Sequence, residues 1–125
     1  MSELFYNYQK TKDHYFTNGQ KMMQERNLRK ASELFWGAIT QSIKALASLS
    51  ETSFRSHNDI RNYMREVKNE IKDEEIYTLF LSLEDLHRNF YDETIPQEDF
   101  PIYYKKVTLF LDKIDKLISN KLNFV

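Results

Sequence analysis

The chain has 125 residues, a formal net charge of −1 at neutral pH and no cysteine. The lack of cysteine excludes a disulfide framework, a thiolate zinc site and a cysteine nucleophile, and we expect a cytoplasmic protein. Because 18 basic residues stand against 19 acidic ones, any contact with nucleic acid has to come from local clustering of charge. We expect neither secretion nor membrane insertion, since no signal-peptide pattern or membrane-length apolar run is visible.

A scarcity of turn residues points to helices. There are two glycines and two prolines, whereas β-rich folds need many such residues at their corners. A hydrophobic fraction of 41% with 30% charged residues is typical of amphipathic helices. A chain of this length usually forms one core. The sequence therefore predicts a single all-α domain over residues 1–125, an antiparallel helical bundle of about five helices.

Apolar residues recur at helical spacing in five segments. Side chains suited to helix N-caps precede three of them, at Ser2, Asp73 and Asp99. A linker over residues 94–98 is the clearest interruption. The expected helices cover about 3–26, 28–48, 58–72 and 74–92, and the last begins after Asp99.

The second of these segments should be the central helix, because only a narrow face of it is polar. We expect its buried positions to include Phe35, Ala38, Ile39 and Leu46. Gly19, on the apolar side of the first segment, marks a place where a neighbouring helix comes close.

One candidate site surrounds His87. At about 100° per residue it lies in the middle of the apolar side of the fourth segment, so we expect it to be largely buried. It would act as a general base or ligand held by Glu84, Asn89 or Tyr91, or else it is a core histidine bonded to another helix. The candidate buried polar site therefore comprises His87, Glu84, Asn89 and Tyr91.

Glu84 and His87 also have the Glu-x-x-His spacing of di-iron carboxylate bundles. Such a centre needs a second copy of the motif, and neither His14 nor His57 has a glutamate three positions earlier. No Ser-His-Asp set, phosphate-binding loop or metalloprotease motif is visible. We therefore expect no metal and no cofactor, and we assign no catalytic residue.

A second candidate is a basic stripe on the third segment. Four cationic side chains fall within a sector of about 60° around the helix axis, and Arg55 and His57 extend them at its start. Such a stripe would grip a phosphate backbone, or it is simply a solvated helix face. The candidate anion- or RNA-binding residues are Arg55, Arg61, Arg65, Lys68 and Lys72.

Three short stretches carry a family resemblance: KASELFWGA at 30–38, IKALA at 43–47 and LHRNFYDE at 86–93. They resemble PaREP-type proteins, a largely archaeal group related to the HEPN superfamily, and the order of elements matches over roughly residues 15–117. The resemblance implies an antiparallel helical bundle that is commonly a homodimer. HEPN-like proteins include ribonucleases of toxin–antitoxin and defence systems and non-catalytic partners of nucleotidyltransferases.

The chain departs from the ribonuclease pattern, in which a histidine follows an arginine after four to six residues. Here the arginine shortly before a histidine is Arg55, and a single residue separates it from His57. The resemblance therefore implies a non-catalytic component that binds RNA, a nucleotide or a partner such as a nucleotidyltransferase-like protein, and whether it is an enzyme stays open.

Two alternative functions remain. The small and aromatic residues Gly19, Ala31, Phe35 and Ala38 have the spacing of a tetratricopeptide hairpin, which would make the chain a helical interaction module. Only one such unit is present, whereas solenoids need about three repeats. The other alternative is a ribonuclease whose active site is displaced from the usual motif.

Overall fold

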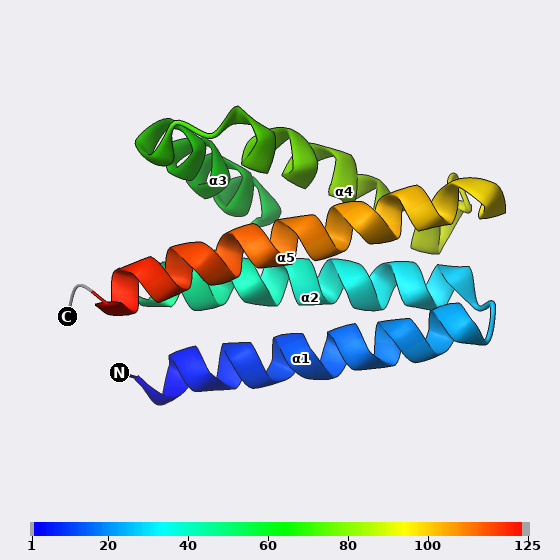
Figure 1. Ribbon diagram of the computed structural model, residues 1–125, viewed down its shortest axis with the longest axis horizontal. Coiled ribbons are helices and arrows are strands. Elements are labelled where there is room, and N and C mark those ends of the chain that lie inside the picture. The colour runs from blue at the N-terminus through cyan, green and yellow to red at the C-terminus, as the bar shows by residue number, and fades with distance from the viewer. Residues whose placement is uncertain (1, 124–125) are drawn as a thin grey trace.

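The computed structural model describes residues 2–123 and is built from helices (Figure 1). This confirms the predicted all-α helical bundle, and the helices begin and end close to the expected positions. A short 3-10 helix, η1 (Gln97–Asp99), leads directly into the last α-helix. The five α-helices are α1 (Glu3–Gln24), α2 (Leu28–Ser48), α3 (His57–Ile71), α4 (Glu74–Asp92) and α5 (Phe100–Asn123).

Side-chain caps begin the helices where the sequence predicts them. The Ser2 hydroxyl accepts a hydrogen bond from the backbone N–H of Phe5 at 3.2 Å, and the Asp73 carboxylate accepts one from Ile76 at 3.3 Å. Each bond satisfies an N–H that has no partner inside the helix. Asp99 differs from the prediction, since it lies inside η1 rather than capping a helix that starts beyond a loop.

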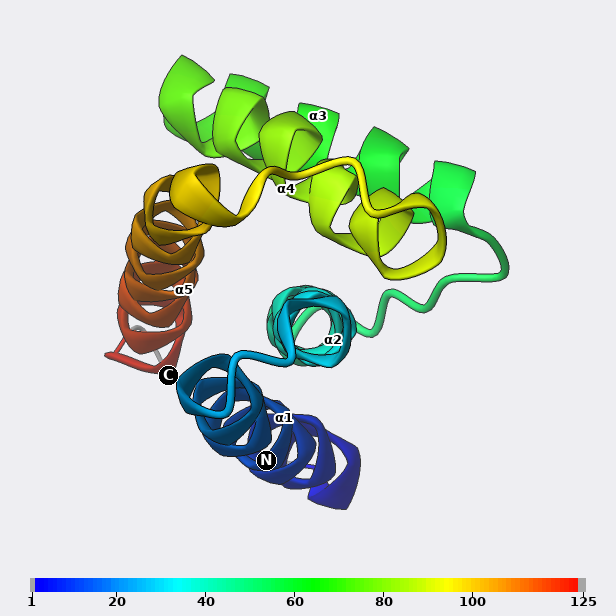
Figure 2. The same ribbon diagram turned by 90° about the vertical axis from the view of Figure 1, so that its right-hand side faces the viewer.

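The second helix is central, as predicted. Figure 2 views α2 nearly end on, with α1 on one side and α4 and α5 on the others. Phe35, Ala38 and Ile39 are 0% exposed and Leu46 is 1% exposed. The near-absence of a polar face on α2 therefore reflects contact with helices on most sides.

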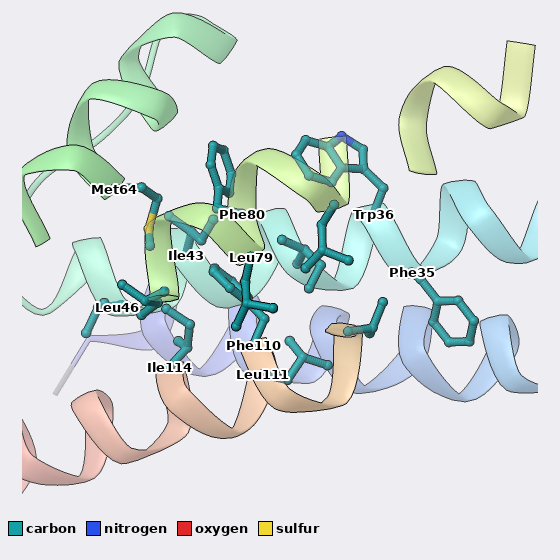
Figure 3. Packing of buried hydrophobic residues seen from close by; sticks show 14 of the residues in the cluster. Phe35, Trp36, Ile43, Leu46, Met64, Leu79, Phe80, Phe110, Leu111 and Ile114 are labelled. Carbon is teal, nitrogen blue, oxygen red and sulfur yellow. The ribbon is translucent and has the colours of Figure 1, made fainter. Parts of the chain in front are cut away.

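α3 and α4 form an antiparallel hairpin that lies across α2 and α5 (Figure 2). Figure 3 shows Phe80 and Met64 of the hairpin beside Ile43 of α2 and Phe110 of α5. The start of α4 is also tied to α5, because Lys113 donates to Asp73 at 2.7 Å and so lowers the pKa of that carboxyl.

Two apolar residues that the helical pattern places inside are exposed. Leu4 is 51% exposed and Ile71 is 37% exposed. Ile71 is the last residue of α3, where the cover by neighbouring helices ends. In the first turn of α1, the side chain that packs inward is Phe5, which is 4% exposed, and not Leu4. Periodicity predicts the side of a helix on which a residue lies, but not how far along the helix the cover extends.

The glycines of α1 and α2 each face an aromatic ring of the other helix at close range. A Cβ added to Gly19 would lie 2.7 Å from Cε1 of Phe35, and one added to Gly37 would lie 2.8 Å from Cδ2 of Tyr15. The Phe35 ring is fully buried, whereas the Tyr15 ring is partly exposed. The predicted close approach at Gly19 is confirmed, and only there is the opposing ring held on every side.

This difference predicts opposite outcomes for two equivalent substitutions. Gly19→Ala should lower the free energy of unfolding by about 1–3 kcal/mol, because the buried Phe35 ring cannot move away from the added methyl group. Gly37→Ala should be neutral or stabilising by up to about 1 kcal/mol, because Tyr15 can swing toward solvent and alanine favours helix. Urea denaturation of both variants measures the difference, and equal effects would contradict it.

Candidate functional site

A surface pocket of about 540 Å³ lies where the first turn of α3, the second half of α4 and one side of α2 meet. We call it the α3–α4 pocket. It brings together residues from both candidate sets: Arg61 from the basic stripe, and Glu84, His87 and Tyr91 from the candidate polar site. The lining residues are Trp36, His57, Arg61, Glu84, His87, Arg88, Tyr91 and Asp92.

Glu84 is the centre of the polar contacts in this pocket. Its Oε2 accepts a hydrogen bond from Nη2 of Arg61 at 2.7 Å and another from Nε2 of His57. The Glu84 side chain is 16% exposed, whereas Arg61 and His57 are 39% and 44% exposed, so these contacts are only partly shielded from water. The hydrogen bond to Glu84 raises the pKa of Arg61, whose Nε is buried without an acceptor among the described residues.

His87 lies in the same pocket but is not buried, which corrects the expectation from periodicity. Its side chain is 48% exposed, and Nδ1 lies 2.9 Å from the Glu33 carboxylate of α2. The first turn of α3 lies opposite Glu84, as the contacts of His57 and Arg61 show. The part of α4 after Glu84 therefore extends beyond the start of α3, and α3 does not cover His87.

An aromatic floor separates the two histidines. The ring of Trp36 has its centroid 5.6 Å from that of His57 and 6.3 Å from that of His87, and Trp36 is only 6% exposed. At the rim, Tyr91 is 64% exposed and packs edge-on against His87 with centroids 5.3 Å apart. The pocket thus combines a buried indole with one open phenol face.

Asn89, the remaining member of the candidate polar site, is separate from the pocket. It is 3% exposed, and its Nδ2 donates to Oγ of Ser32 on α2 at 2.9 Å. Its Oδ1 accepts from the backbone N–H of Ile95 at 2.7 Å. Asn89 therefore fastens the end of α4 and the following linker to α2, which is a structural role.

Most of the basic stripe lies along the seam between α3 and α4. Arg65 donates to the Tyr77 hydroxyl at 3.0 Å, and Lys68 lies over the same ring with Nζ 5.0 Å from its centroid. Lys72 ends α3 in the left-handed conformation, with φ of 56°. Arg55 is exposed in the loop before α3. Neither of these two residues lines the α3–α4 pocket, so Arg61 and the adjoining His57 link the stripe to it.

Three pocket residues belong to neither candidate site: Trp36, Arg88 and Asp92. His57 was predicted only as an extension of the basic stripe, and its spacing of four positions from Arg61 places both on the same face of α3. The helical position of Trp36 predicts a core residue, and Trp36 is indeed buried. The meeting of α3 with the second half of α4 depends on tertiary packing, which no local pattern encodes.

The hydrogen bonds limit what the pocket can do chemically. A carboxylate only accepts, so Nε2 of His57 and Nδ1 of His87 carry protons toward their glutamates. Nδ1 of His57 and Nε2 of His87 are then the basic atoms of the neutral rings. Among residues 2–123, no group of three or more metal-ligating side chains comes together. The arrangement can bind anions and can exchange protons.

Comparisons with known proteins identify a family. The family model described as the Archaeal PaREP1/PaREP8 family matches residues 7–111. Since the match covers well over half of the chain, the chain belongs to this family. No curated protein and no solved structure matches it. None of the helices between residues 3 and 123 combines the length and the apolar character needed to cross a membrane.

The separation of Asn89 from the pocket predicts different effects for two nearby residues. Asn89→Ala should lower the free energy of unfolding by about 1–3 kcal/mol, because it leaves the Ile95 N–H without its acceptor and removes the donor to the buried Ser32 oxygen, whose hydroxyl still donates to Leu28. His87→Ala removes an exposed side chain and should change stability by less than about 0.5 kcal/mol. Equal losses in urea denaturation would mean that the bond from His87 to Glu33 holds α4 on α2.

Proposed function

We propose that this member of the archaeal PaREP1/PaREP8 family binds RNA or a nucleotide in the α3–α4 pocket. The proposal is carried by one observation: two imidazoles and two guanidinium groups converge in a pocket with an aromatic floor. In this proposal the chain is a HEPN-like domain that binds its ligand without needing the arginine–histidine ribonuclease motif. Arginine forks suit phosphate oxygens, which makes a phosphate-bearing ligand the favoured class.

The available donors support phosphate binding. Arg88 is paired through Nη1 with Asp85 at 2.9 Å, and its side chain is 60% exposed. A guanidinium has five N–H donors, so most of those on Arg88 remain for a ligand. Arg61 is 39% exposed and bonds Glu84 through Nη2, so its Nη1 can donate to a ligand as well. Glu84 and Asp92 lie in the same pocket and partly offset these cations.

The aromatic residues favour a nucleotide over a simple anion. Tyr91 is 64% exposed beside His87, and an open ring at the rim of a phosphate site is a surface on which a base can stack. Single-stranded RNA presents such unstacked bases together with its phosphates. The pocket therefore suits one nucleotide of a single strand, with its phosphate held by Arg88 and Arg61.

RNA binding can be assigned to the pocket by two matched charge reversals. Arg88→Glu alters the pocket, whereas Lys72→Glu makes the same charge change at the far end of the basic stripe. We expect Arg88→Glu to weaken the binding of a fluorescent single-stranded RNA about tenfold, because an attractive charge becomes repulsive. Lys72→Glu should stay within about twofold. Fluorescence anisotropy at low salt measures both.

Equal losses from the two reversals would show that RNA responds to the overall charge and not to the pocket. No affinity of the native protein for RNA or for a nucleoside monophosphate would overturn the proposed function.

RNA cleavage is the second candidate, because each imidazole is hydrogen-bonded to a carboxylate. One imidazole would take the proton of a ribose 2′-hydroxyl as its oxygen attacks the phosphorus, and the other would protonate the departing 5′-oxygen. Gel analysis of the same RNA separates binding from cleavage. Intact RNA supports a binding protein, whereas shortened RNA that both His57→Ala and His87→Ala abolish would make the pocket a ribonuclease site.

We also propose that the chain forms a homodimer. The core does not bury all of the large aromatic residues: Trp36 is buried, but Tyr6 is 56% exposed outside the α3–α4 pocket. Leu4, Leu81 and Leu109 add exposed apolar surface, which a second copy would cover. Light scattering at high micromolar concentration should return twice the chain mass of 15.1 kDa. A monomer would contradict the homodimer and favour a heterologous partner such as a nucleotidyltransferase-like protein.

A further inference from the structure

A second and larger pocket lies at the end of the bundle where the α1–α2 turn meets η1 and the start of α5. In Figure 2 this end of the molecule faces the viewer. We call it the α1–α5 pocket, and its volume is about 820 Å³, within the range of small-molecule sites. It shares no lining residue with the α3–α4 pocket.

The wall of the α1–α5 pocket is mainly apolar. Phe100 is 3% exposed, and Met23 and Leu28 are partly buried side chains packed against the core. The Tyr104 hydroxyl is already bonded to Nε2 of Gln20 at 2.9 Å. Ile102 also lines the pocket and is 54% exposed. Binding of a hydrocarbon over open apolar surface in a pocket of this size is favourable, because it removes that surface from water.

The charges around this wall all have one sign. Arg26 and Lys105 line the pocket, and no aspartate or glutamate does. Among residues 2–123, neither of these two cations lies within ion-pair distance of a carboxylate, so both are available to a ligand. Two cations without counter-charges beside an apolar wall complement a ligand whose hydrocarbon body ends in an anion.

We propose that the α1–α5 pocket binds an amphiphile with one anionic head, a carboxylate or a phosphate, and a hydrocarbon body. The body covers the wall of Met23, Leu28 and Phe100, and the head lies near Arg26 and Lys105. A purely apolar ligand would leave both cations without a partner. A cationic amphiphile would meet repulsion from both. This binding is independent of the RNA or nucleotide site.

Four dodecyl compounds that differ only in the head test the proposal. Calorimetric titration below the micelle concentration compares dodecanoate, dodecyl phosphate, dodecanol and dodecyltrimethylammonium. At least one of the two anions should bind, about tenfold more tightly than the alcohol, and the cation should not bind detectably. The stronger of the two anions distinguishes a carboxylate head from a phosphate head. An alcohol that binds as well as both anions would overturn the proposal.

A matched pair of double variants locates the head. Arg26→Glu with Lys105→Glu should lower the affinity for the preferred anion about tenfold or more, because both cations become repulsive. Lys10→Glu with Lys116→Glu makes the same charge change at exposed positions outside the pocket and should leave the affinity within about twofold. Equal losses in both double variants, or no binding of either anion to the native protein, would overturn the assignment.

Discussion

α2 has little surface of its own, because α1, α4 and α5 pack around it. Fully burying a side chain such as Phe35 or Ile39 contributes about 1.5–3 kcal/mol, most of which is offset by the conformational entropy that folding removes. The candidate site depends directly on this burial. Trp36 forms the floor of the α3–α4 pocket, and Glu33, three positions earlier, accepts from His87. A displaced α2 would therefore lose the floor and one of the two histidine contacts together.

The α3–α4 pocket itself results from a difference in helix length. α3 has 15 residues and α4 has 19, and they run antiparallel with the first turn of α3 opposite Glu84. The last turns of α4 consequently extend past α3, which leaves His87, Arg88 and Tyr91 accessible beside His57. A longer α3 would cover these side chains and bury the imidazole of His87. The same short hairpin therefore supplies both the partly buried ion pair to Glu84 and the open surface next to it.

Much of the fold could be predicted from the sequence, since the helix bounds, the caps at Ser2 and Asp73 and the central place of α2 all follow from local patterns. The site could be predicted only in part. The side of α4 on which His87 lies was predicted correctly. Its predicted burial was wrong, because burial at this position depends on where α3 starts relative to α4. Asn89 was grouped with His87 by proximity in the chain, whereas its hydrogen bonds turn it toward Ser32. The position of His57 beside α4 could not be predicted from the sequence, because it depends on how α3 packs against α4.

The histidines allow a direct measurement of the central claim, that the α3–α4 pocket holds a phosphate-bearing ligand. The chain has three histidines, and the third, His14, lies on α1 with Asn18 as its hydrogen-bond partner. Titration of the protein with a nucleoside monophosphate, followed by NMR of the imidazole ring protons, should shift the signals of His57 and His87 together and leave that of His14 in place. Unchanged signals from both pocket histidines, or equal shifts of all three, would contradict the account.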